Sequence, residues 1–310
     1  MPKQIVILDS TQIDAYCTCP SLWNYEYNEN VVLDSETKDD IKMGTLGHKW
    51  LEIFYRAKAL HADIGTAVSA ANAFDPDALD VADAHEFPLD KEKRRTVIER
   101  LQLYWMKYNK LKDFVPLCKR VHSIEIDSEG NVVDCYKPLP LVEQGFSYEL
   151  LNTPEYLFVL EGRIDVLTEI NGAHHWVDHK FQIRERTLYS KSIQFRNYSL
   201  VTGCSIGIIN YIRLHKDVKD STLQRQLVSF GPHEIRAWRS ELIDIFIRVA
   251  KDLKRASSEG VYAFNKNRAA CPGKFGYECQ YTHICDEPNP GVAQAIKIEK
   301  YKKRKEWRPW

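Results

Sequence analysis

The amino-acid sequence predicts an α/β fold in which helices flank one mixed β-sheet. Between residues 155 and 260, patterns typical of strands and helices follow one another in the order strand, hairpin, helix, strand and helix. The 310 residues are 44% hydrophobic and 11% aromatic, which is enough to build a substantial core. The length suits one large domain or two small ones.

Charge and hydropathy narrow the class of protein. The 43 basic residues equal the 43 acidic ones, but a neutral total still permits a local basic surface that binds nucleic acid. The start of the sequence lacks a signal-peptide pattern, and no apolar run reaches the length that spans a membrane. We therefore expect a soluble, cytoplasmic protein. In a reducing compartment, clustered cysteines favour metal binding over disulfides.

The elements of the first half are predicted from periodicity. Residues 10–56 have a helical pattern, with a break near Gly44 where glycine and threonine occur together. Residues 90–111 predict a helix, because apolar side chains such as Val97 and Leu101 recur at helical spacing. Residues 120–127 and 130–135 flank Gly130 and predict a hairpin.

The second half has the most regular pattern. Residues 155–170 predict a long strand, and the Asn-Gly pair that follows supplies the positive φ angles of a tight hairpin turn. Residues 175–182 are the returning strand. Three further elements complete the sheet and its cover, namely a helix at 189–203, a buried strand at 205–215 and a long helix at 232–260.

The hairpin carries residues that suit a metal. Asp165 lies in its first strand, and Asp178 and Lys180 lie in its second. Because side chains two apart leave the same face of a strand, Asp178 and Lys180 share a face. Two carboxylates on neighbouring strands can bind Mg²⁺ or Mn²⁺, and a lysine beside them can stabilise charge on a phosphate. Two ordinary aspartates with a solvated lysine are the alternative interpretation.

The cysteines are the second chemical feature. Residues 271–285 hold Cys271, Cys279 and Cys285, although common cysteine-rich metal centres have four ligands. Buried free thiols are the alternative to a metal. The remaining cysteines at 118, 135 and 204 fall in apolar segments, and we expect them in the core.

The hairpin and its surroundings resemble the active site of the PD-(D/E)xK nuclease superfamily, and most closely its RecB-like branch. The signature elements are Gly162–Asp165, Asp178–Lys180 and Gln194–Tyr198, together with an upstream histidine, His48, in the segment GTLGHKWLE. The resemblance implies that His48, Asp165 and Asp178 bind Mg²⁺ or Mn²⁺, with the carbonyl of His179 as a further oxygen. It implies that Lys180 is catalytic, and that Gln194 and Tyr198 brace the site or contact DNA. The side chain of His179 points to the other face of its strand, so we expect it to be structural.

An iron–sulfur subgroup of this branch, which includes AddB-like and CRISPR-associated exonuclease-like proteins, has one cysteine near the N-terminus and three near the C-terminus. The segment STQIDAYCTCPSLWNYEY resembles its upstream pattern, with Cys19 before Pro20. The resemblance therefore implies a [4Fe–4S] cluster on Cys19, Cys271, Cys279 and Cys285 that holds the two ends of the chain together. A four-thiolate zinc site is the alternative, and Cys17 is the alternative to Cys19.

Together these features predict a restriction-endonuclease-like mixed sheet whose N- and C-terminal segments join at a four-cysteine metal centre. We expect one nuclease domain over 1–310, with a cluster-binding part at 1–60 and 260–290, a catalytic core at 120–215 and a basic tail at 291–310. The tail is interpreted either as a phosphate contact or as a solvated surface helix. The resemblance implies metal-dependent, exonuclease-like hydrolysis of DNA that is single-stranded or has free ends. A recombination or replication protein is the expected partner. The alternative is an inactive nucleic-acid-binding or scaffold protein of the same fold.

Overall fold

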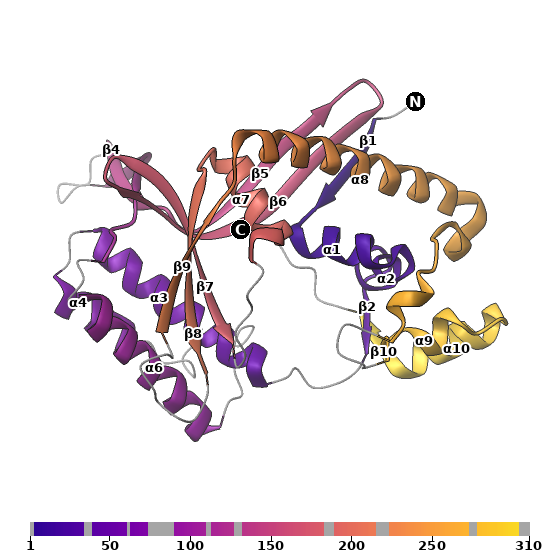
Figure 1. The fold of residues 1–310 in the computed structure, drawn as a ribbon, viewed down its shortest axis with the longest axis horizontal. Coiled ribbons are helices and arrows are strands. Elements are labelled where there is room, and N and C mark those ends of the chain that lie inside the picture. The colour runs from indigo at the N-terminus through magenta and orange to yellow at the C-terminus, as the bar shows by residue number, and fades with distance from the viewer. Residues whose placement is uncertain are drawn as a thin grey trace.

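A computed structural model places a mixed six-stranded sheet at the centre of the molecule, with helices on both of its faces (Figure 1). The structure describes residues 3–33, 39–60, 63–73, 90–109, 113–126, 132–182, 189–214, 223–272 and 278–303. The predicted α/β class is confirmed. Among the described residues, no helix has the combination of length and apolar character that crossing a membrane requires.

The central sheet has the strand order β1-β6-β7-β8-β9, and β5 pairs with β6. The β1–β6 and β7–β8 pairs are parallel, whereas β5–β6, β6–β7 and β8–β9 are antiparallel. The strands are β1 (Gln4–Leu8), β5 (Val142–Asn152), β6 (Tyr156–Ile170), β7 (Ala173–Gln182), β8 (Ile206–Arg213) and β9 (Leu223–Ser229).

The long strand β6 organises the sheet. One edge of β6 pairs with β5 over most of its length. The opposite edge pairs first with β1, up to Leu160, and then with β7, from Val166 onward. On this edge, residues 161–165 of β6 therefore face the gap between β1 and β7. The predicted Asn-Gly turn joins β6 to β7, with positive φ angles at both Asn171 and Gly172.

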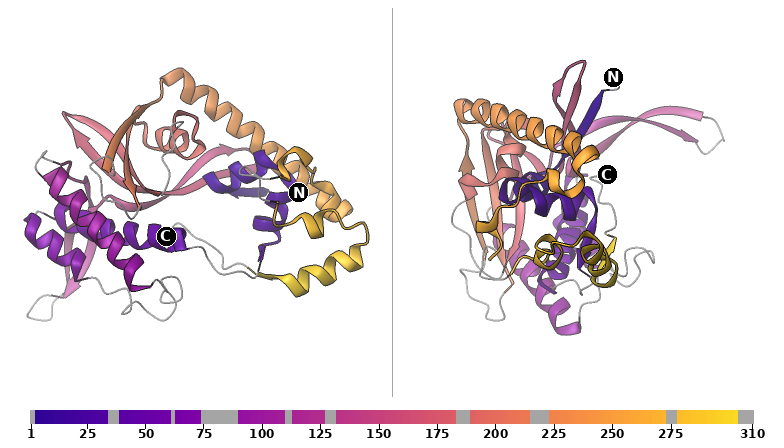
Figure 2. Two further views of the ribbon diagram at one scale, coloured as in Figure 1. Left: turned by 60° about the horizontal axis from the view of Figure 1, so that its bottom comes forward. Right: turned by 90° about the vertical axis from the view of Figure 1, so that its right-hand side faces the viewer.

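One face of the sheet is covered by α3 (Asp39–Ala59), α4 (Ile64–Asn72) and α6 (Lys91–Asn109). In the left view of Figure 2 these helices lie together below the strands. Helix α3 lies close to β7 because Gly47 has no side chain. A Cβ atom at Gly47 would come within 2.4 Å of the Phe181 ring. This close approach sets the position of the next residue, His48.

The other face is covered by α1 (Ser10–Thr18), α7 (Ile193–Thr202) and α8 (Pro232–Glu259). Helix α1 begins where the Asp9 carboxylate accepts the N–H groups of Thr11 and Gln12. Helices α7 and α8 end, as predicted, at Gly203 and Gly260, both of which have positive φ angles.

The two ends of the chain form a second, smaller core. After α2 (Pro20–Trp23) and a π-helix (Asn24–Asn28), strand β2 (Val31–Leu33) pairs antiparallel with β10 (Tyr301–Lys303). The rings of Tyr25 and Tyr301 each stack on the ring of Tyr281, at centroid distances of 5.5 and 5.7 Å. Figure 1 shows the yellow C-terminal helices α9 (Thr282–Cys285) and α10 (Pro290–Lys300) beside this N-terminal segment. The two ends of the chain therefore lie together, and their joining at a four-cysteine metal centre stays a prediction.

Several expectations from the sequence need correction. Helix α3 continues through Gly44, because packing of its apolar face outweighs the low helix propensity of one glycine. Cys118 is exposed and not in the core, because it begins β3 (Cys118–Ile126), which pairs with β4 (Val132–Pro140) in a separate two-stranded ribbon. Cys204 is buried as expected. The side chain of Cys135 and the tail beyond residue 303 lie outside the described residues.

Candidate active site

Asp165 and Asp178 lie where β6 and β7 separate. The last paired residues of the two strands are Val166 and Val177, so each aspartate is the first residue beyond the ladder. Both side chains are nearly inaccessible to solvent, at 7% exposure for Asp165 and 1% for Asp178. The backbone N–H of His179 donates to Oδ2 of Asp165 at 2.7 Å, which fixes the carboxylate against β7.

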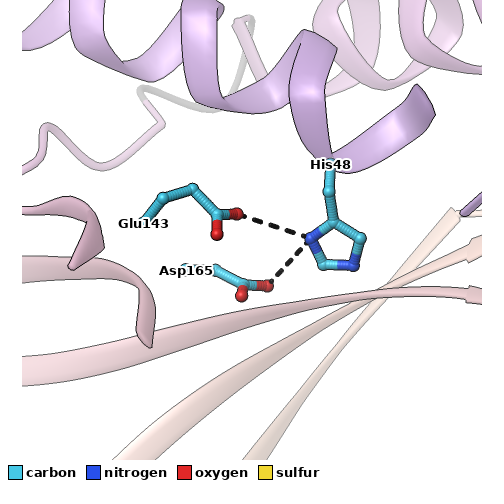
Figure 3. Close-up of side chains that lie close together, drawn as sticks. All are labelled: His48, Glu143 and Asp165. Carbon is cyan, nitrogen blue, oxygen red and sulfur yellow. Dashed lines mark ion pairs between the residues drawn. The ribbon is translucent and has the colours of Figure 1, made fainter. Parts of the chain in front are cut away.

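His48 approaches this fork from α3. Its Nδ1 atom lies 3.4 Å from Oδ2 of Asp165 and 3.6 Å from Oε1 of Glu143, as Figure 3 shows. One ligand atom from each of the three residues lies within 4.8 Å of the other two. A nitrogen and two carboxylate oxygens at this spacing can hold a divalent cation.

Glu143 is a site residue that sequence reasoning missed. It lies on β5, between Val142 and Gln144, which pair with Val166 and Ile164 on either side of Asp165. Its φ angle is +50°, a left-handed conformation that is uncommon for a residue other than glycine and is often found at functional sites. Its second carboxylate oxygen accepts from Nε of Arg163 at 2.7 Å.

Lys180 and Asp178 share one face of β7, as predicted. Nζ of Lys180 lies 2.7 Å from Oδ2 of Asp178. The same ammonium group donates to Oε1 of Gln194 on α7 at 3.0 Å. The amide nitrogen of Gln194 in turn donates to Oδ1 of Asp178 at 3.2 Å. Aspartate, lysine and glutamine thus form a closed ring of polar contacts.

Tyr198 extends this ring to β6. Gln194 donates to the Tyr198 hydroxyl at 2.6 Å, and that hydroxyl donates to the carbonyl oxygen of Arg163 at 2.7 Å. Arg163 lies in the stretch of β6 that faces the gap between β1 and β7. Gln194 and Tyr198 therefore connect α7 to both strands of the fork. This bracing is one of the two roles that the resemblance implied for them.

The electrostatics of the fork favour a cation. Burial raises the pKa of Asp178 to about 6, although the Lys180 ammonium opposes the shift. Burial also raises the pKa of Asp165, although His48 opposes the shift. For His48, burial lowers the pKa, but the charges of Asp165 and Glu143 outweigh it and raise the pKa above its ordinary value. The raised pKa of His48 shows that the neighbouring carboxylates attract positive charge, which a divalent cation would also supply.

The side chain of His179 packs on the far face of β7, as expected for a structural residue. Its ring stacks on Tyr55 at a centroid distance of 5.5 Å and an interplanar angle of 13°. Its Nδ1 lies 3.1 Å from the amide nitrogen of Asn210 on β8. Burial lowers the pKa of His179 well below its ordinary value, so the ring is neutral. The edge of its ring approaches His48, at a centroid distance of 6.3 Å, and its backbone N–H binds Asp165.

Glu52, one helical turn after His48, does not join the site. Its carboxylate oxygens contact Nζ of Lys49 at 2.9 Å and Nε of Arg56 at 3.0 Å, along the side of α3. These contacts leave His48 as the residue of this helix that reaches the two carboxylates of Glu143 and Asp165.

The four predicted cysteine ligands surround one small cavity. Cys19, Cys271, Cys279 and Cys285 all line it, although they come from opposite ends of the chain. The Sγ atom of Cys19 accepts the backbone N–H of Asn267 at 3.3 Å, a contact that a thiolate ligand favours. Cys17 lines a different groove.

A comparison with curated proteins gives no match. Among solved structures, the crystal structure of SSO0001 is similar over 80% of this chain and 78% of that chain, at 12% identity and a TM-score of 0.33. That distant likeness adds nothing to the assignment. The sequence profile of the PD-(D/E)XK nuclease superfamily matches residues 10–286, a span that includes the fork, α7 and all four cysteines. The chain belongs to the PD-(D/E)XK nuclease superfamily.

Proposed function

We propose that the protein is a metal-dependent DNA nuclease whose active site is the fork between β6 and β7. The observation that carries the proposal is that the His48–Asp165 and Lys180–Asp178 pairs lie together at the fork, from α3, β6 and β7, where the charges of Asp165 and His48 both act on the pKa of Asp178. An inactive scaffold protein of the same fold would not need this set of buried charges. Burying these charges costs free energy, and such clusters of buried titratable groups are typical of functional sites.

His48, Asp165 and Asp178 are the residues proposed to hold Mg²⁺ or Mn²⁺. Among the described residues, His48 and Asp165 lie close enough to share a cation together with Glu143, which is an additional candidate, whereas the Asp178 carboxylate contacts Lys180 and Gln194. The donor set fits these ions, since hard cations prefer oxygen ligands and neutral histidine is a common metal ligand. When bound, such an ion polarises a phosphoryl oxygen and lowers the pKa of a water molecule. The carboxylate of Asp165 is already oriented for this role by the backbone of His179.

Lys180 is the proposed catalytic residue. Asp178 and Gln194 hold its ammonium group at the edge of the fork, with 22% of the side chain exposed. A positive charge in this position would stabilise the negative charge that develops on a phosphate and would orient the attacking water. Because Gln194 is itself held by Tyr198, the position of the ammonium group is fixed before the substrate binds.

The proposed substrate is DNA that is single-stranded or has a free end, and the proposed mode is exonuclease-like. This part rests on the resemblance to the RecB-like branch. A partner protein in recombination or replication is proposed on the same ground. Whether cleavage requires a free DNA end is tested by comparing linear and circular substrates, because variants of the active site would not show it.

The second centre proposed is a [4Fe–4S] cluster on Cys19, Cys271, Cys279 and Cys285. The four side chains surround one cavity, and their neighbours Tyr25, Tyr281 and Tyr301 form the core between the chain ends. A cluster here would cross-link the ends and would take no part in hydrolysis. A zinc ion bound by the same four thiolates is the alternative.

One experiment tests the function and its substrate together. Protein purified without oxygen is incubated with circular and linear DNA, each single- and double-stranded, with Mg²⁺ or Mn²⁺ and with EDTA as the control. Degradation of linear DNA that requires the cation and spares circular DNA supports the proposal. Cleavage of circles would assign an endonuclease, and absence of cleavage on all substrates would favour the scaffold protein.

A further inference from the structure

A groove of about 900 Å³ lies between the C-terminal half of α8, the end of α1 and residues 265–267. We call it the α8 groove. Its lining includes Tyr16, Thr18 and Asn267 but none of the residues of the fork. It is therefore a separate feature of the surface, which the proposed active site does not explain.

The α8 groove is rich in positive charge. Helix α8 contributes Arg248, Lys251, Lys254 and Arg255, all of them exposed. Because residues three and four apart face the same side of a helix, Arg248, Lys251 and Arg255 form one stripe. Among the described residues, Asp252 is the one carboxylate that lines the groove.

Most of this charge is uncompensated. Asp252 accepts the Tyr16 hydroxyl at 2.7 Å and lies 3.2 Å from Arg255. Arg248, Lys251 and Lys254 make no ion pair with any residue in the described ranges. Arg255 also lies 3.8 Å from Glu259, so the charge of Arg248, Lys251 and Lys254 remains without an ion pair among the described residues. Exposed cations of this kind attract a polyanion.

The rest of the lining suits a phosphate backbone more than bases. It consists largely of hydroxyl and amide side chains, which donate hydrogen bonds to phosphate oxygens. The ring of Tyr16 is buried, and its hydroxyl is engaged by Asp252, so this ring is not available for stacking on a base. Recognition in the groove would therefore be independent of sequence.

The size of the groove points to a single strand. Arg248 and Arg255 are seven residues apart, which corresponds to about 10 Å along the helix. The volume of about 900 Å³ is that of a pocket for a ligand of moderate size, such as a few linked nucleotides. A duplex would lie across such a groove without entering it.

The walls of the groove are held in place. The side-chain amide of Asn267 donates to the carbonyl oxygen of Thr18 at 2.8 Å, and its backbone N–H donates to Sγ of Cys19. These contacts join the segment after α8 to the end of α1. The groove is thus formed before any ligand binds, which lowers the entropic cost of binding.

We propose that the α8 groove binds the sugar–phosphate backbone of one nucleic-acid strand, outside the active site. The proposal rests on the proposed nuclease function and adds a second contact that holds the substrate strand. Its chemistry is electrostatic, and its ligand is the phosphodiester backbone of single-stranded DNA.

The test is the salt dependence of binding, measured without cleavage. A labelled single-stranded oligonucleotide is titrated with protein in EDTA at several salt concentrations, for the wild type and the triple variant R248Q/K251Q/K254Q. The matched control is K91Q/K119Q/R120Q, which removes three exposed cations from α6 and β3. Single variant Lys254→Gln provides a milder change.

Each lost phosphate contact reduces the slope of log Kobs against log salt by about 0.7 for a single strand, so the triple variant should lose about 2. If the triple variant and the wild type bind equally at about 1 M salt, the variant should bind about 100-fold more weakly than the wild type at about 0.1 M. Lys254→Gln should lose about 0.7, and the control variant should bind like the wild type.

Two results overturn the proposal. One is an unchanged slope in both groove variants when thermal unfolding shows that they are folded. The other comes from the same titration with polyglutamate in place of the oligonucleotide. If the triple variant loses binding to polyglutamate but binds DNA like the wild type, the groove is assigned to an acidic protein partner. Both are independent of the proposed function, which fails only if the wild type does not cleave DNA with Mg²⁺ or Mn²⁺.

Discussion

Nδ1 of His48, on α3, lies 3.4 Å from Oδ2 of Asp165, on β6, so a helix and a strand far apart in sequence meet at one point. Two features bring them together. Gly47 lets α3 approach the Phe181 ring on β7, and the backbone of His179 orients the Asp165 carboxylate toward the helix. The contact joins the side of the sheet covered by α3 to the fork that carries Asp178 and Lys180.

Replacing His48 by alanine should raise the Mn²⁺ concentration that gives half-maximal activity at least tenfold, because one ligand of the cation is lost. Activity at saturating Mn²⁺ should recover in part, since Asp165 and Asp178 remain. Glu52→Ala is the matched control, as it lies on the same helix but pairs with Lys49 and Arg56. An unchanged requirement in His48→Ala would make the histidine a structural residue.

Replacing Glu143 by glutamine should weaken Mn²⁺ binding without unfolding the protein. Glutamine keeps an oxygen that can accept from Arg163, but it loses the charge that faces His48. Calorimetric titration of the metal-free protein should give a dissociation constant about tenfold higher than that of the wild type. Equal constants would show that Glu143 positions Arg163 and does not bind the cation.

Replacing Asp178 by asparagine should stabilise the metal-free protein above about pH 6. The folded pKa of Asp178 is about 6, higher than the value of about 3.9 in an unfolded chain. The folded state therefore binds more protons between these values, so the free energy of unfolding of the wild type falls as pH rises through this window. Two pKa units correspond to roughly 3 kcal/mol.

Asparagine has no charge to bury, so the variant should lack this pH dependence. Chemical denaturation in EDTA at about pH 4 and about pH 7 measures the difference, and added Mn²⁺ should reduce it by stabilising the wild type more than the variant. A variant less stable than the wild type at about pH 7 would mean that the contact with Lys180 outweighs the cost of burial.

Replacing any one of Cys19, Cys271, Cys279 and Cys285 by serine should lower the stability and solubility of the protein first and its activity as a consequence. Protein purified without oxygen should be brown and contain about four iron and four sulfide ions per chain. Cys17→Ser is the control and should have a mild effect on stability, since Cys17 lines the α8 groove and is not among the residues that line the cavity of the four cysteines. Elemental analysis that finds one zinc and no iron would show a zinc site in place of the cluster. If all four serine variants fold and cleave normally, the proposed cross-link is wrong.

The parts of the site that sequence could predict depend on short spacings. The Asn-Gly turn fixes the register of β6 against β7, and the two-residue spacing of Asp178 and Lys180 places both on one face. Gln194 and Tyr198, four apart on α7, likewise contact each other. These relations need only the local geometry of a strand, a turn and a helix.

The parts that sequence could not predict depend on pairing at a distance. Glu143 reaches His48 only because β5 pairs with β6 and because its own backbone has a positive φ angle. Strands β1 and β9 were missed, the first because it is short and the second because its polar residues suit an edge strand. Strand β2 has three residues and forms only by pairing with β10 at the other end of the chain.

The most direct test of the account is cleavage of linear DNA with Mn²⁺ by the wild type, Asp178→Ala and Lys180→Ala. Circular dichroism and thermal unfolding check that each variant is folded. The account predicts that the wild type degrades the DNA and that both variants lose activity by at least a hundredfold, since each removes a group at the reacting centre. Wild-type rates in either folded variant would contradict the placement of the active site at the fork.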